Sequence, residues 1–165
     1  MLSQLKWPAA LAGVVCALAI GVGSVQAQSP SRPQKVVATK PAAKVHKLAI
    51  QIDENDPKVM NLALNNAKNV LEYYKSKGEQ VTVELVTFGP GLHMLRADTS
   101  PVKDRIAAMS LEHNNLVFAA CGNTQANMSK QENKQISLIS EAKLVPSGVV
   151  RLMELQGQGF AYVRP

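Results

Sequence analysis

Cys121 is the residue of this sequence best suited to chemistry. Only one other cysteine, Cys16, is present, and it lies in an apolar N-terminal stretch. Cys121 follows an apolar run at residues 116–120 that has the character of a buried strand, and it precedes Gly122, where a helix is expected to begin. Backbone N–H groups at a helix N-terminus favour negative charge, so this position predicts a thiol that readily forms thiolate. The alternative interpretation is that of a small buried residue that only packs.

Polar segments follow two other predicted strands. Residues 53–55 come after a strand at 47–52, and residues 89–93 come after a strand at 81–88. The carboxyl ends of parallel strands meet at one edge of a sheet, so we expect Asn55 and His93 at the same edge as Cys121.

These positions suggest supporting roles around the thiol. His93 would accept its proton, and Asn55 would form a wall of the pocket. Asn123 and Thr124 follow Cys121 directly and would supply hydrogen-bond donors to its anion. His93 as an ordinary helix-surface residue is the alternative.

Other catalytic and cofactor motifs are missing from the sequence. His46, His93, His113 and Cys121 lack the spacing of zinc ligands. Neither a Gly-x-Gly-x-x-Gly run nor a Gly-x-Ser-x-Gly run occurs. We therefore expect no metal and no cofactor.

Hydrophobic periodicity predicts strands that alternate with helices. Strands are expected at 47–52, 81–88, 115–120, 144–145 and 160–163. Helices are expected from Pro57, which follows the N-cap Asp56, and further along the chain near residues 101–109, 121–128, 129–142 and 147–157. This order predicts a single three-layer α/β domain, with a mainly parallel sheet of four or five strands and helices on both faces.

The first 45 residues have the composition of a targeting segment and a linker. Lys6 precedes an apolar stretch at 9–22, and small residues end at Ala27, so residues 1–27 are expected to be a signal peptide cleaved near Ala27. Residues 28–45 are rich in Pro, Ala and Lys and predict a disordered linker. The protein is therefore expected to be periplasmic or secreted, with no membrane association after cleavage. A signal retained as an anchor is the alternative.

Basic charge is concentrated outside the predicted domain at 46–165. Five of the 18 basic residues precede residue 46, whereas all 12 acidic residues follow it, so the domain has a formal charge near +1. Nucleic-acid binding requires basic residues clustered on the folded surface. We therefore expect no nucleic-acid partner.

Several blocks of the sequence resemble the DsrE/DsrF-like family. They are IQIDEND at 50–56, NLALNNA at 61–67, FGPG at 88–91, FAACGNT at 118–124, VPSGVV at 145–150 and FAYVRP at 160–165. The resemblance covers nearly all of residues 46–165. It implies an α/β domain that forms trimers or hexamers and, in some members, carries sulfur on a cysteine as a persulfide. Cys121 stands at the position of that cysteine and takes this role by the resemblance.

The sequence thus predicts an exported sulfur-handling protein in which Cys121 carries or transfers sulfane sulfur, with a protein as sulfur donor or acceptor. Characterised relay members of the family are cytoplasmic, which sets an exported member apart from them. Two alternatives follow from the residues. One is a non-catalytic module of this fold that binds a small ligand or a subunit, with Cys121 structural. The other is a redox role through an intermolecular disulfide.

Overall fold

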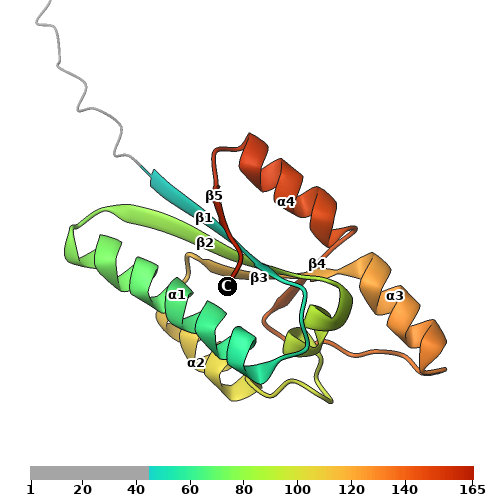
Figure 1. The fold of residues 1–165 in the computed structure, drawn as a ribbon. Coiled ribbons are helices and arrows are strands. Elements are labelled where there is room, and N and C mark those ends of the chain that lie inside the picture. The colour runs from blue at the N-terminus through green and yellow to red at the C-terminus, as the bar shows by residue number, and fades with distance from the viewer. Residues whose placement is uncertain (1–44) are drawn as a thin grey trace, which may run out of the picture. The chain divides into compact units, whose positions relative to one another are not determined.

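The computed structural model describes residues 45–165 (Figure 1). The predicted signal peptide and all but the last residue of the predicted linker lie outside these residues. The elements, in chain order, are β1 Val45–Ile52, α1 Pro57–Ser76, β2 Gln80–Thr87, the 3-10 helix η1 Gly89–Leu95, α2 Lys103–Glu112, β3 Leu116–Cys121, α3 Gly122–Gln131, β4 Ala142–Val145, α4 Gly148–Gly157 and β5 Ala161–Val163.

The five strands form one parallel sheet in the order β4-β3-β2-β1-β5. The predicted fold class, an α/β domain with a parallel sheet, is confirmed. Strands β1 to β4 are neighbours in the sheet in the same sequence as in the chain. Strand β5 follows β4 in the chain but pairs with β1. At the carboxyl edge of the sheet, this register pairs Cys121 of β3 with Val145 of β4.

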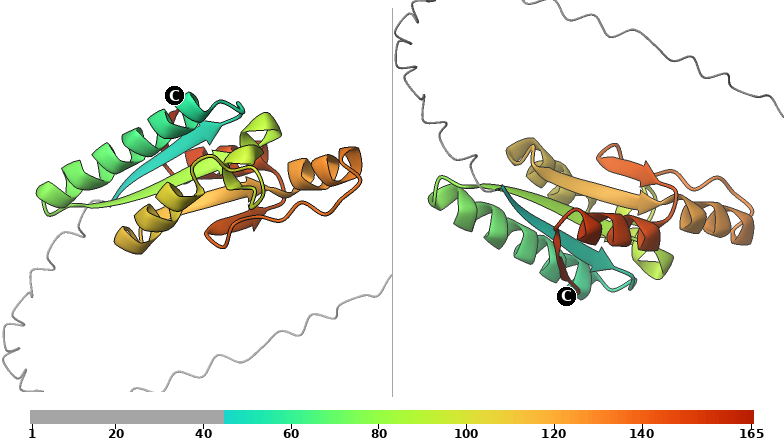
Figure 2. Two further views of the ribbon diagram at one scale, coloured as in Figure 1. Left: turned by 90° about the horizontal axis from the view of Figure 1, so that it is seen from below. Right: turned by 90° about the horizontal axis from the view of Figure 1, so that it is seen from above.

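Helices cover the two faces of the sheet unequally. The larger core cluster lies between the sheet and the helices α1, α2 and η1. It includes Leu64, Leu92, Ile106 and Phe118. On the other face α4 packs over a smaller cluster that includes Ala119 and Leu155. Figure 2 shows α1 and α2 on one side of the sheet, α4 on the other, and α3 extending beyond the strand ends.

Helix α1 begins as the sequence predicts, at Pro57 after the N-cap Asp56. The Asp56 carboxylate accepts a 2.7 Å hydrogen bond from the N–H of Lys58, and Pro57 occupies the first turn, where no N–H partner is needed. Gly78 follows the helix with φ +67°, a conformation that residues with a side chain adopt at a cost.

The helix predicted at 129–142 is wrong. Helix α3 continues without a break to Gln131, and residues 132–141 run as turns and extended chain into β4. Ser129 does not cap a helix, because its hydroxyl donates to the Gln125 carbonyl and accepts from the N–H of Ile136. The capping-box spacing of Ser129 and Glu132 therefore lies at the end of one helix and does not start another.

A buried ion pair holds α4 on its face of the sheet. Glu84 of β2 is 3 % exposed, and its two carboxylate oxygens accept from Arg151 of α4 at 2.7 and 2.8 Å. A bidentate pair of this kind fixes direction as well as distance. It sets the position of the first turn of α4, which begins next to the end of β3.

Candidate functional site

The chain leaves two neighbouring strands toward opposite faces of the sheet near Cys121. After β3 the chain enters α3, where Met128 packs against the core on the α1 side. After β4 the chain enters α4, on the other face. Ligands of parallel α/β sheets bind in the crevice formed where successive connections part in this way. Cys121, the last residue of β3, lies beside that crevice.

The Cys121 thiol lies close to the N-termini of two helices, α3 and α4. Cys121 is itself the N-cap of α3, and its Sγ accepts from the N–H of Thr124 at 3.5 Å. Burial alone raises the pKa of this thiol and is the largest single influence. The Thr124 hydroxyl and the backbone N–H groups of Gly148, Thr124 and Asn123 together outweigh it and lower the pKa below its ordinary value. The site therefore favours thiolate despite its burial.

Glycine allows α4 to start close to the thiol. A Cβ built on Gly148 would lie 2.9 Å from the side chain of Phe88. A side chain at this position would therefore push the N-terminus of α4 away, and with it the N–H group that faces Cys121.

Cys121 is nearly enclosed. Its exposed fraction is 4 %. It shares the face of β3 that carries Ala119 beneath α4, since alternate residues of a strand point the same way. A reaction at Sγ therefore requires a local opening of the segments around it.

Three of the predicted supporting residues lie together in a groove on the α1 side of the same edge. This groove, which we call the amide groove, has a volume of about 360 Å³. Its polar lining consists of Asn55, His93, Thr124, Asn127 and Gln131. Cys121 does not line it, and His93 bonds through Nδ1 to the Thr99 hydroxyl at 2.8 Å. The arrangement thus brings Asn55, His93 and Thr124 together, but separates His93 from the thiol.

Thr124 belongs to both places. Its hydroxyl oxygen accepts from the N–H of Gly89 at 3.0 Å in the groove wall, and its own N–H donates to Cys121 Sγ. Asn123, by contrast, contributes to the thiol through its backbone N–H alone.

Three further positions of the candidate site are not predicted from the sequence. Gly148 was interpreted only as part of a helix start, because its approach to Cys121 depends on the pairing of β3 with β4. Asn127 and Gln131 follow Thr124 at three and seven residues along α3, a spacing that places them on one helical face. That spacing was the available signal.

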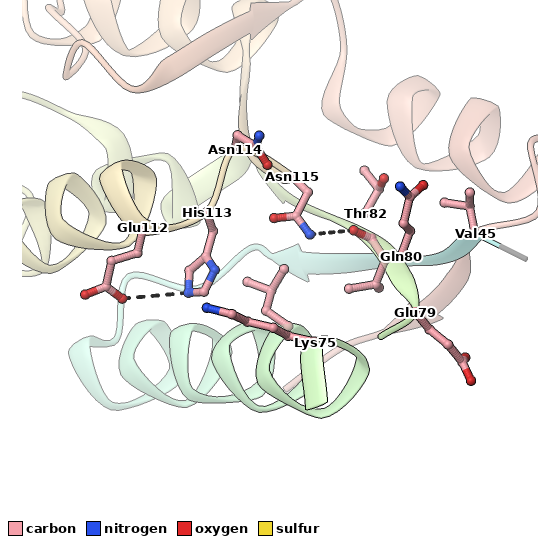
Figure 3. Close-up of a pocket in the computed structure, with 11 residues that line it drawn as sticks. Val45, Lys75, Glu79, Gln80, Thr82, Glu112, His113, Asn114 and Asn115 are labelled. Carbon is pink, nitrogen blue, oxygen red and sulfur yellow. Dashed lines mark hydrogen bonds and ion pairs between the residues drawn. The ribbon is translucent and has the colours of Figure 1, made fainter. Parts of the chain in front are cut away.

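A second hollow lies at the opposite edge, at the amino ends of the strands (Figure 3). It has a volume of about 440 Å³ and includes Lys75, His113 and Asn115. The Asn115 amide is bonded to the Val81 carbonyl at 2.6 Å, and Nε2 of His113 is buried with no hydrogen-bond partner among residues 45–165. This hollow lies at the amino ends of the strands, whereas Cys121 and the amide groove lie at the carboxyl ends. The hollow is therefore separate from the candidate site.

Within residues 45–165 no group of three or more His, Cys, Asp or Glu side chains is arranged to hold a metal ion. Over the same range, no helix has the length and apolar character that crossing a membrane would require.

Comparisons with known proteins bear on the fold. No protein-family model and no curated protein matches the chain. The chain is similar to a solved structure described as a protein of unknown function, MTH1491, from Methanobacterium thermoautotrophicum. The two are 27 % identical with a TM-score of 0.61, and the alignment covers 73 % of this chain and 99 % of that one. This likeness supports the α/β architecture over most of the chain.

Proposed function

We propose that the protein is an exported sulfur-handling protein in which Cys121 carries sulfane sulfur as a persulfide. The observation that supports it most is the set of donors around Sγ, from Thr124, Asn123 and the start of α4. Donors of this kind stabilise an anion, and both the attacking thiolate and the persulfide Cys–S–S⁻ are anions.

The chemical step is a sulfur transfer that needs no oxidant. With thiosulfate as donor, the Cys121 thiolate attacks the outer sulfur, the S–S bond of thiosulfate breaks, and sulfite leaves with the bonding electron pair. The product is Cys121–S–S⁻, so the total charge and the number of sulfur atoms are conserved. In the onward transfer, an acceptor thiolate attacks the outer sulfur of Cys121–S–S⁻, the S–S bond of the persulfide breaks, and Cys121 leaves as the thiolate.

Sulfur labelling tests this proposal. After incubation with thiosulfate or polysulfide, the wild-type protein should gain the mass of one sulfur atom on the peptide that contains Cys121. Cys121→Ser should gain none. Wild-type protein blocked with iodoacetamide beforehand is the matched control, and it should also remain unlabelled. Equal labelling of the wild type and Cys121→Ser would refute the proposal.

An exposed apolar surface supports a second candidate, a subunit-binding module in which Cys121 only packs. Val149, Val150 and Met153 of α4 are each more than half exposed. We call these three residues the α4 patch. Apolar side chains gathered in this way commonly mark a protein interface. Assembly as a trimer or hexamer is part of the proposal.

The alkylation rate of Cys121 separates the two candidates. A thiol with a lowered pKa is alkylated by iodoacetamide over a lower pH range than a model cysteine peptide, whatever its burial does to the absolute rate. A midpoint of the rate–pH profile at or above that of the peptide favours the structural role.

A further inference from the structure

The hollow at the amino ends of the strands, which we call the amino-end hollow, contains a buried nitrogen without a partner (Figure 3). The ring of His113 lines this hollow, and its side chain is only 11 % exposed. Its Nε2 atom makes no hydrogen bond within residues 45–165. A buried polar atom without a hydrogen bond destabilises a fold, so its presence in a native structure calls for a functional reason. Nε2 of His113 therefore marks a position where a ligand atom is expected.

The backbone around His113 holds its ring in a fixed position. Its N–H donates to the Met109 carbonyl at 3.0 Å at the end of α2, and its carbonyl accepts from the N–H of Leu116 at 3.3 Å at the start of β3. The side-chain amide of Asn115 anchors the same loop to the Val81 carbonyl at 2.6 Å. A binding group that is already held in place loses little freedom when a ligand arrives.

Two charged side chains of opposite sign flank Nε2. Oε2 of Glu112 lies 3.8 Å from it, which is too far for a hydrogen bond. Lys75, in the last turn of α1, extends toward the His113 ring in Figure 3 and forms no ion pair within residues 45–165. Both side chains are exposed, so they can turn aside to admit a ligand. The other carboxylate of the lining, Glu79, is already paired with His46 at 2.6 Å.

This arrangement fits the ammonium and carboxylate groups of an α-amino acid. With its proton on Nε2, the His113 ring donates to a ligand carboxylate, as does Lys75, while the ligand ammonium donates to Glu112. Bond lengths place the nitrogen of an α-amino acid roughly 2.7–3.6 Å from its carboxylate oxygens. That separation is close to the 3.8 Å between Nε2 and Oε2 of Glu112. A simple anion or a simple cation would leave one of the two protein charges without a partner.

The apolar part of the lining indicates the side chain of the ligand. Leu71 and Val81 are buried and line the hollow together with Val45. An apolar ligand side chain that covers these atoms would be removed from water. The volume of about 440 Å³ lies within the range of small-molecule sites, roughly 300–1,000 Å³. An amino acid with an apolar side chain therefore fits better than glycine.

We propose that the amino-end hollow binds a free α-amino acid with an apolar side chain, held through His113, Lys75 and Glu112. The hollow lies at the edge of the sheet opposite to Cys121. This inference therefore goes beyond sulfur carriage and does not depend on it.

Ligand-observed NMR on the full chain tests the binding, with L-leucine as the probe. The comparison ligands keep the apolar part of leucine: 4-methylpentanoate lacks its ammonium group, and 3-methylbutylamine lacks its carboxylate. L-Leucine should bind the wild type roughly tenfold more tightly than either, because each analogue loses one charged contact. Saturating L-leucine should also shift the ring resonances of His113.

Two variants and a matched control locate the site. His113→Phe keeps a ring at this position and removes Nε2, and Lys75→Gln removes the ammonium. Each should bind L-leucine roughly tenfold more weakly, because one polar contact is lost. Lys75→Gln alters an exposed side chain, so it keeps the test valid if His113→Phe fails to fold. Lys68→Gln is the matched control, since Lys68 is exposed on the same helix outside the hollow.

The control Lys68→Gln should bind L-leucine like the wild type. The proposed site would be overturned if L-leucine does not bind, or if either analogue binds as tightly as L-leucine. Undiminished binding by Lys75→Gln, or an equal loss in Lys68→Gln, would overturn it as well.

Discussion

At the scale of single residues, Cys121 is subject to two opposing influences. Enclosure at 4 % exposure disfavours its anion, whereas the donors of α3 and α4 favour it, and the balance lowers the pKa of the thiol. If Cys121 carries a persulfide as proposed, the same enclosure would shield it from solution oxidants, as the proposed export to an oxidising compartment would require. Reactivity and protection thus come from one arrangement.

Arg96 is another residue whose charge is balanced in the interior. It is 1 % exposed and pairs with Asp98 and with Glu132, which lies just after α3. Its guanidinium lowers the pKa of Glu132 from 4.5 to about 2, with a further contribution from Lys134, and also lowers the pKa of Asp98. The cluster joins the loop after η1 to the end of α3.

Because of this cluster, we expect the folded protein to lose stability at acid pH. A carboxylate whose pKa is lower in the folded protein stabilises the fold above its unfolded pKa, and this contribution disappears as the pH falls toward the folded pKa. The free energy of unfolding, measured with urea, should therefore fall between the unfolded value of 4.5 and the folded value of about 2 for Glu132.

Glu132→Gln should be less stable near neutral pH and should show a shallower decline over that interval. Glu72→Gln, which alters an exposed carboxylate of α1 beside Lys68, is the matched control and should follow the wild-type profile. A Glu132→Gln profile parallel to that of the wild type would contradict the assigned role of the cluster.

At the scale of elements, the site depends on how closely strand ends and helix starts approach each other. Gly91 in η1 packs against the end of β1, and a Cβ on it would lie 2.2 Å from the Ile52 carbonyl oxygen. No side-chain rotation relieves a contact with backbone. The 3-10 helix therefore keeps its place only with glycine here.

Gly91→Ala should lower the free energy of unfolding by about 3 kcal/mol, the upper range for overpacking. Gly157→Ala, in the last turn of α4, is the matched control because nothing lies within 4 Å of its added Cβ. It should be neutral or more stable by about 0.5 kcal/mol. Urea unfolding measures both, and equal stabilities of the two variants would contradict the packing argument.

The order and limits of most elements could be predicted from the sequence, because local signals mark them. Asp56 and Ser147 cap α1 and α4 as expected, and alternating apolar residues marked β1. The helix at 129–142 failed since a capping-box spacing also occurs where a helix ends. Contacts set by strand pairing, such as Gly148 with Cys121, have no local signal. Nor did sequence show that His93 would turn toward Thr99.

At the scale of the whole molecule, the two faces of the sheet differ in how fully they are covered. The α1 side has the large core, while the α4 side has one helix whose outer surface carries the α4 patch. Burying an apolar surface of this kind against a second copy of the chain stabilises the assembly. Self-association through the α4 patch follows from the proposal.

Sedimentation of the wild-type protein should reveal an assembly larger than a monomer, a trimer or hexamer. Val149→Glu/Met153→Glu should dissociate it, because each interface charge without a partner costs about 3 kcal/mol. Leu111→Glu is the matched control, since Leu111 is 90 % exposed on α2, on the other face. A monomeric wild type, or equal dissociation by both variants, would contradict assembly through this surface.

The central claim concerns the sulfur atom of Cys121, and intact-mass and peptide mass spectrometry of the protein purified from its native compartment tests it most directly. The account predicts a population with one or more additional sulfur atoms on the peptide containing Cys121, removed by dithiothreitol. Only unmodified thiol on that peptide, both as purified and after exposure to thiosulfate or polysulfide, would contradict it.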